Sequence, residues 1–133
     1  MHIHGSCHCG AIRFTADIDP DGVTVCHCSD CQVLSGAPMP AIVRAPIGQV
    51  HLHGNPKAYL KTAQSGQRRA QAFCGECGTP LYGCAAENPP CVVIRLGCVA
   101  ERAALPPRKQ IWTRSAMPWV HGLANVPGCA EAS

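Results

Sequence analysis

Large aromatic side chains are scarce in this chain: tryptophan, tyrosine and phenylalanine together make up 5% of the sequence. Long apolar runs are also missing, because 12 prolines and 13 glycines interrupt them. Proline and glycine are frequent in turns and unfavourable inside helices. These absences favour short strands and turns over long helices. They also exclude a transmembrane helix, which needs a run of about 18 apolar residues.

Charged residues are equally sparse, at 14% of the chain, and the formal net charge is only +3 at pH 7. No basic run is longer than a pair such as Arg68-Arg69. Nucleic-acid-binding proteins usually carry a strongly basic face, so we expect no nucleic-acid partner and no membrane partner. Residues 1–10 lack the charged-then-apolar plan of a secretory signal. We therefore expect a cytoplasmic protein.

Repeats, low-complexity segments and linkers are absent as well, and 133 residues are typical of one domain. The end of the chain is rich in glycine, proline and alanine, which is typical of a loosely ordered terminus. We predict a single domain over residues 1–121 and a loosely ordered tail over residues 122–133.

Alternation of apolar and polar residues predicts most of the secondary structure. The predicted strands cover residues 11–18, 23–25, 41–44, 50–53, 58–61, 69–73, 81–83 and 91–96. Residues 29–34 are typical of one helical turn, with Ser29 as the N-cap and Gly36 and Pro38 ending it. The fold class predicted from this pattern is mainly β with short helical turns.

Cysteine, in contrast, is abundant, with eleven residues. An odd count without a secretory signal argues against a disulfide framework. Several cysteines are separated by only one or two residues, a spacing that metal chelation uses readily. Reduced thiolates on zinc suit a reducing compartment, so the sequence predicts Zn²⁺ as the cofactor at two sites.

The first predicted site combines two cysteine pairs that are distant in the sequence, Cys7-His-Cys9 and Cys74-Gly-Glu-Cys77. Together they supply the four thiolates of a closed, structural zinc site. Such a site also joins the first strand to the middle of the chain and closes a long loop. The alternative is that these cysteines are buried as small apolar side chains.

The second predicted site is Cys26-His-Cys28-Ser-Asp-Cys31, which has three thiols within six residues. Three protein ligands leave one tetrahedral position open, and an open position distinguishes catalytic from structural zinc. An open site of this kind can bind a substrate thiol as the reactive thiolate. The alternative is a fourth protein ligand, for which the candidates are Cys84, Cys91, Cys98 or a histidine.

The histidines are weaker candidates. His8 and His27 lie between cysteines of the two motifs, where adjacent side chains point to opposite faces. The pairs His2/His4 and His51/His53 alternate on apparent strands, and we expect both pairs to lie on solvated faces.

The motifs also occur in a family-specific order. Gly5-Ser-Cys-His-Cys-Gly-Ala-Ile-Arg-Phe14 is followed by Cys26-His-Cys-Ser-Asp-Cys31 and Ser35-Gly-Ala37, then by Phe73-Cys-Gly-Glu-Cys-Gly-Thr79, Ile111-Trp112 and Trp119. In this order the chain resembles the glutathione-dependent formaldehyde-activating enzyme family, which also includes centromere protein V. The resemblance covers most of the chain, from about Gly5 to Trp119.

The resemblance implies a zinc-stapled β-tent fold, a structural zinc on Cys7, Cys9, Cys74 and Cys77, and a catalytic zinc on Cys26, Cys28 and Cys31. It further implies a carbon–sulfur lyase that joins a thiol and an aldehyde, namely glutathione and formaldehyde, into S-hydroxymethylglutathione. A tripeptide with two carboxylates needs cationic contacts. Four basic residues can supply these contacts or can lie on the solvated surface: Arg44, Lys61, Arg68 and Arg69. Trp112 and Trp119 can form a wall of the substrate cleft or can belong to the core.

Two other functions compete with this one. The first is a non-catalytic zinc-binding interaction module, which would have a fully protein-ligated second zinc and no cavity beside it. The second is a redox enzyme of the methionine sulfoxide reductase B type, which would need reactive cysteines away from the metal. Only Cys84, Cys91, Cys98 and Cys129 qualify for that role, and no flanking motif supports them.

Overall fold

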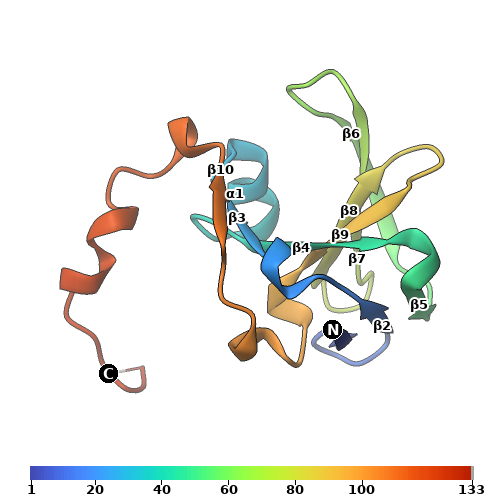
Figure 1. Cartoon of the computed structure of the whole chain (residues 1–133), viewed down its shortest axis with the longest axis horizontal. Coiled ribbons are helices and arrows are strands. Elements are labelled where there is room, and N and C mark those ends of the chain that lie inside the picture. Colours follow the sequence, from blue (N-terminus) through green and yellow to red (C-terminus); the bar gives the residue numbers. More distant parts are fainter. Residues whose placement is uncertain (133) are drawn as a thin grey trace.

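The computed structural model describes residues 1–132 and arranges their strands in two sheets (Figure 1). The smaller sheet has the order β1-β2-β5 and is antiparallel throughout. Its strands are β1 (His2–Ser6), β2 (Arg13–Asp17) and β5 (Val50–His53). His2, His4, His51 and His53 are exposed in this sheet, as the sequence predicted.

The larger sheet has seven strands in the order β10-β3-β4-β9-β8-β7-β6. Strand β10 runs parallel to β3, and all other neighbours are antiparallel. The strands are β3 (Thr24–Cys26), β4 (Ala41–Pro46), β6 (Lys57–Thr62), β7 (Arg68–Phe73), β8 (Pro80–Ala85), β9 (Cys91–Arg95) and β10 (Lys109–Ile111). The predicted mainly β class is confirmed.

Helices are short in the described part of the chain. The α-helix α1 covers Ser29–Ser35, and the 3-10 helices are η1 (Pro20–Gly22), η2 (Ile47–Gln49), η3 (Leu96–Cys98), η4 (Arg102–Ala104), η5 (Thr113–Ser115) and η6 (Val120–Asn125). The prediction of Ser29 as N-cap of α1 is wrong. Cys28 holds that position, because its Sγ accepts a hydrogen bond from the Cys31 N–H. The helix ends at Gly36, as predicted, with a left-handed φ of 68°.

One hydrophobic cluster joins the inward faces of the two sheets. It includes Ile3 and Phe14 from the smaller sheet and Val43, Leu81 and Ile94 from the larger one, all nearly inaccessible to solvent. Gly5 pairs with Phe14 across β1 and β2, and the aromatic ring occupies the space of a side chain at this position. Strands β1 and β2 of the smaller sheet therefore pack closely where the first cysteine motif begins.

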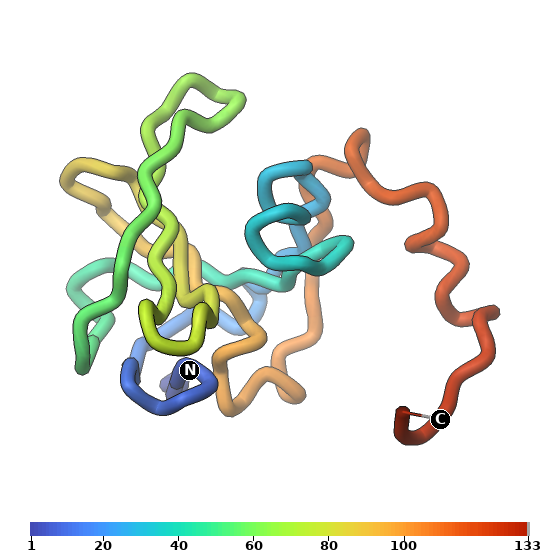
Figure 2. Tube along the Cα trace, turned by 180° about the vertical axis from the view of Figure 1, so that it is seen from behind, coloured from blue at the N-terminus to red at the C-terminus, as the bar shows by residue number. Residues whose placement is uncertain are grey.

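The segment after β10 leaves the two sheets and runs away from them (Figures 1 and 2). Val120 is buried, but Trp119, Leu123 and Val126 are exposed. Residues 122–125 belong to η6, so part of the predicted tail is helical, and Ser133 lies outside the described residues. The domain boundary at residue 121 and the loose order beyond it stay predictions. In residues 1–132 we find no helix with the length and apolar character that spanning a bilayer requires.

Candidate metal centres and the adjoining cavity

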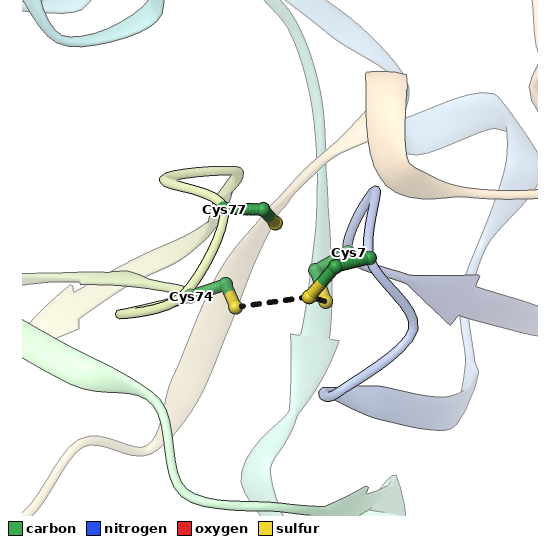
Figure 3. Close-up of side chains that lie close together, drawn as sticks. Cys7, Cys74 and Cys77 are labelled. Atoms are coloured by element: carbon green, nitrogen blue, oxygen red, sulfur yellow. Dashed lines mark hydrogen bonds between the residues drawn. The ribbon is translucent and has the colours of Figure 1, made fainter.

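The first cysteine centre gathers four sulfur atoms from two turns (Figure 3). The Sγ atoms of Cys7, Cys9, Cys74 and Cys77 all lie within 4.8 Å of one another. Figure 3 labels Cys7 from the first turn and Cys74 and Cys77 from the second. Cys9 Sγ is 3.6 Å from Cys7 Sγ and 3.8 Å from Cys74 Sγ. Zinc with four sulfur ligands at about 2.3 Å places those sulfurs about 3.8 Å apart. The donor set and its spacing therefore fit a tetrahedral zinc ion.

Backbone N–H groups donate hydrogen bonds to a cysteine sulfur in each of the two turns. The Ile12 N–H donates to Cys7 Sγ at 3.2 Å, and the Glu76 N–H donates to Cys74 Sγ at 3.4 Å. Gly78 has a φ of +78°, a conformation that glycine adopts without steric cost, and it closes the second turn. Hydrogen bonds to the charged form of a group stabilise that form. Both turns are thus suited to thiolates.

Thr79 links the two turns. Its Oγ1 accepts a hydrogen bond from the His8 N–H at 3.0 Å and lies 3.2 Å from Cys77 Sγ. Hydrogen bonds from Thr79 hold the pKa of Cys77 at about 5, well below the usual value of a thiol. The His8 ring is not part of the sulfur group.

The second cysteine centre comes from one continuous segment. Cys26 ends β3, Cys28 caps α1, and Cys31 lies in the first turn of that helix. Their Sγ atoms lie within 4.8 Å of one another, and among residues 1–132 no fourth ligand side chain joins the group. The Cys31 N–H donates to Cys28 Sγ at 3.3 Å. Three soft sulfur donors at this spacing fit a zinc or similar ion with one position left for another ligand.

The pKa of Cys31 is about 5, mainly because Cys26 hydrogen-bonds to its sulfur and also because the Arg95 guanidinium lies beside it. The same hydrogen bond with Cys31 raises the pKa of Cys26 above the usual value of a thiol. Arg95 is therefore the nearby cation that favours the thiolate form of Cys31.

The residues considered as a fourth protein ligand lie elsewhere. Cys84 and Cys98 are buried in the hydrophobic cluster, and burial raises the pKa of Cys98 to about 11. Cys91 is the first residue of β9. His27 is fully buried and does not belong to the sulfur group, and its Nε2 lies 2.8 Å from Gln110 Oε1.

A cavity of about 710 Å³ adjoins the second centre, and Cys26, Cys28 and Cys31 form part of its wall. Its lining is rich in cations, and the cationic residues are Arg44, Lys61, Arg69, Arg95 and Lys109. Asp19 and Asp30 supply the opposite charge, and Asp30 pairs with Lys61. Arg68, also considered for substrate contact, lies outside the cavity in an ion pair with Glu87.

Trp112 lines one side of the cavity, whereas Trp119 is exposed and is not part of the lining. Trp112 has a φ of +57°, a left-handed conformation that costs a non-glycine residue about 1–3 kcal/mol. The Arg114 guanidinium lies 4.9 Å from the centre of its ring. Gln32 of α1 fixes this wall, because its Nε2 donates to the carbonyls of both His27 and Ser115.

Residues 2–115 match the family model of the glutathione-dependent formaldehyde-activating enzyme, which is most of the chain. The chain belongs to this family. The resemblance seen in the cysteine motifs is thereby confirmed. The chain therefore shares its ancestry with these enzymes.

Two further proteins are similar to this member of the glutathione-dependent formaldehyde-activating family. An uncharacterized lyase of Schizosaccharomyces pombe is 30% identical over 78 residues, which is 59% of this chain and 54% of the yeast protein. The alignment thus spans about half the length of this curated relative. A Rhodobacter sphaeroides protein of known crystal structure has a TM-score of 0.61 and 18% identity, covering 80% of this chain and 98% of that one. This second likeness shows a shared fold.

The sequence assigned no role at the second centre to three side chains of this family member. Arg95 and Gln71 line the cavity from neighbouring regions of the large sheet, and Gln32 holds the wall that includes Ser115. The sequence offers one indication that Arg95 is unusual, because this charged residue directly follows the apolar run 91–94. It offers no such indication for Gln71 or Gln32.

Proposed function

We propose that this protein is a zinc-dependent carbon–sulfur lyase that joins a glutathione-like thiol and a small aldehyde such as formaldehyde into an S-hydroxymethyl adduct. In this proposal Cys26, Cys28 and Cys31 hold the catalytic ion, and Cys7, Cys9, Cys74 and Cys77 hold a structural one. The family match and the lyase name of the yeast relative support the reaction class.

The observation that carries the proposal is a three-sulfur group in the wall of a large cavity. A non-catalytic interaction module would need a second centre closed by a fourth protein ligand, with no cavity beside it. In residues 1–132 the sulfur group has no such ligand within its 4.8 Å radius. The geometry therefore favours an enzyme over the module.

The chemistry follows from what each part supplies. Bound zinc would act as a Lewis acid that holds the substrate thiol as a thiolate. The thiol sulfur then forms a bond to the carbonyl carbon, and the π electron pair of the carbonyl moves to its oxygen. That oxygen takes up the proton that the thiol released, so the product is the S-hydroxymethyl adduct and the reverse reaction breaks the same carbon–sulfur bond.

The cavity cations would bind the body of the thiol. Arg44, Arg69 and Lys109 line the cavity and form no ion pair with a carboxylate among residues 1–132. Arginine binds carboxylates through two parallel hydrogen bonds, so these side chains suit the carboxylates of a tripeptide. Fixing both ends of the thiol holds its sulfur in reach of the aldehyde, which lowers the entropic part of the barrier.

A reducing, cytoplasmic setting suits this chemistry. All eleven cysteines are free of disulfide bonds. Oxidation would join the sulfurs that the proposal assigns to zinc, and the thiol substrate itself requires reduction. We therefore place the protein in the cytoplasm as part of the proposal.

The test is a measurement of exchange between formaldehyde and the adduct in the presence of glutathione, by ¹³C exchange NMR, with protein carrying two zinc ions per chain. We expect exchange well above the uncatalysed rate, loss of this excess in Cys28→Ser, and no loss in the matched variant Cys91→Ser, whose sulfur lies outside both centres. An uncatalysed rate with fully zinc-loaded protein, for formaldehyde and other small aldehydes alike, would favour the interaction module.

A further inference from the structure

Arg95 is a buried cation with an unusual set of partners. It is the last residue of β9, and only 8% of the residue is exposed. Its Nη1 lies 3.7 Å from Cys31 Sγ, and its Nη2 donates to Gln71 Oε1 at 3.2 Å. In the described part of the chain it pairs with no carboxylate. A buried charge is costly unless an opposite charge compensates it, so the sulfur group must supply that charge.

The formal charges of the second centre show why a cation is needed there. Three thiolates on a divalent ion carry a net charge of about −1, and a fourth thiolate from a substrate makes it about −2. Arg95 reduces this excess by one unit at hydrogen-bonding distance from a ligand sulfur. The attraction between opposite charges at this separation is substantial in a partly buried site. The cation therefore favours the thiolate-bound state of the centre over a state with a neutral fourth ligand.

Gln71 holds the guanidinium without neutralising it. Gln71 lies on β7 and reaches Arg95 of β9 across Gly83 of β8, with which it pairs. A Cβ atom at Gly83 would lie 3.0 Å from Gln71 Oε1, so the missing side chain leaves room for this contact. An amide oxygen orients the guanidinium by one hydrogen bond but carries no charge. A carboxylate at the same position would compete with Cys31 for the cation.

We propose that Arg95 is a positioning residue that balances the charge of the three-cysteine centre and makes it select an anionic sulfur, rather than a neutral nitrogen ligand, as its fourth ligand. The inference rests on the proposed function insofar as this centre holds a divalent ion. The cavity cations then have two separate roles. Arg95 acts on the charge at the sulfur, whereas Arg44, Arg69 and Lys109 act on the remainder of the substrate.

The test uses the cobalt-substituted protein and two small probes. 2-Mercaptoethanol binds as a thiolate but has no carboxylates for the other cations, and imidazole binds as a neutral ligand of similar size. The affinity of each is measured from the cobalt–sulfur charge-transfer and d–d absorption bands. For Arg95→Gln we expect the affinity for 2-mercaptoethanol to fall about tenfold or more, while the affinity for imidazole stays within about twofold.

Three further variants make the result specific. Arg95→Lys, which keeps the charge, should restore part of the thiol affinity. Gln71→Glu, which keeps Arg95 but gives it a carboxylate, should weaken thiol binding in the same direction as Arg95→Gln and serves if that variant does not fold. Arg68→Gln, a matched change outside the cavity, should alter neither affinity.

Two outcomes overturn the inference. In the first, Arg95→Gln and Gln71→Glu lower the affinities for 2-mercaptoethanol and imidazole by the same factor, or leave both affinities unchanged. Arg95 then does not select for charge, although the proposed function stands. If the wild-type cobalt centre takes up no thiol at all, the proposed function and the inference both fail.

Discussion

Three cysteines, one in each turn that contributes to a centre, accept a hydrogen bond from a nearby backbone N–H. The donors are Ile12 for Cys7, Cys31 for Cys28 and Glu76 for Cys74. Such bonds stabilise a thiolate because they favour the charged form. What differs between the centres is the surrounding chain: the first joins turns 65 residues apart, whereas the second lies within six residues. Loss of one sulfur should therefore have different consequences at the two centres.

For Cys74→Ser we expect loss of cooperative thermal unfolding, because the proposed structural zinc would join β1 to the turn after β7 and contribute directly to folding. For Cys28→Ser we expect a folded protein with one zinc ion per chain. Circular dichroism melting curves and metal analysis of both variants check this. Equal loss of the fold in both would contradict the division into a structural and a catalytic centre.

Gly5 supplies a second test at the scale of a residue. A Cβ atom at this position would lie 2.0 Å from Phe14 Cζ, and the ring is buried in the hydrophobic cluster. Gly5→Ala should lower the free energy of unfolding by about 1–3 kcal/mol, the usual cost of overpacking a core. The control is Gly48→Ala, which has open space around the new methyl group. Urea unfolding that gives the same free energy for both variants would refute the close packing of β1 on β2.

At the scale of elements, the short strand β1 is held at its outer side by the segment around η4. The His4 N–H donates to Glu101 Oε2 at 2.9 Å, and His4 Nδ1 lies 2.6 Å from Glu101 Oε1. The Ala100 N–H donates to the His4 carbonyl at 2.8 Å. These contacts fix the strand that leads directly into Cys7.

The Glu101 contact has a pH dependence of defined sign. The hydrogen bond from the His4 N–H, and secondly the His4 ring, hold the pKa of Glu101 below its usual range in the folded state. A depressed pKa of this kind stabilises the fold at pH values above the unfolded pKa of about 4.3, and the stabilisation disappears as the pH falls through the folded pKa. Glu101→Gln should therefore melt at a lower temperature than the wild type at pH 7.

The same difference in melting temperature should shrink as the pH falls below about 4. Loss of bound zinc in acid would lower the melting temperatures of both proteins alike, so it does not contribute to the difference between them at a given pH. A difference that is constant across pH would mean that the carboxylate charge does not act on β1.

The elements that the sequence revealed are those with local signals. Period-two alternation identified the strands from β2 to β9. Cysteine spacing identified the two close pairs and the three-cysteine segment from which the sulfur groups are built, because spacing within each motif is a local property. Strand β10 was missed, since Lys109 and Gln110 are both polar and exposed and the strand forms by pairing with β3, more than 80 residues earlier. Arg95 and Gln71 were missed for the same reason: their contacts exist only once three strands of the large sheet are assembled.

At the scale of the whole molecule, the two centres lie in different surroundings. The first lies where the smaller sheet meets the turn between β7 and β8, and the second faces the cavity between α1 and the large sheet. The proposed function thus assigns stability to the first region and ligand binding to the second. The C-terminal segment contributes to the cavity through Trp112, but its later part runs away from both centres (Figure 2).

Removal of residues 122–133 tests this view of the C-terminal segment. The exposed side chains of Leu123 and Val126 bury little surface, so we expect the melting temperature, zinc content and thiol binding to change little. A truncation at residue 111 is the control, because it removes the cavity wall at Trp112 and should weaken thiol binding. A large loss of stability on removing only residues 122–133 would place the domain boundary beyond residue 121.

The central claim is that one zinc ion is enclosed by four protein sulfurs and the other by three. X-ray absorption at the zinc edge measures this directly on protein carrying two zinc ions per chain. The account predicts an average of about 3.5 sulfur ligands per zinc without added thiol, rising to about 4 when glutathione is added. An average of 4 before any thiol is added, or no change on adding it, would contradict the account.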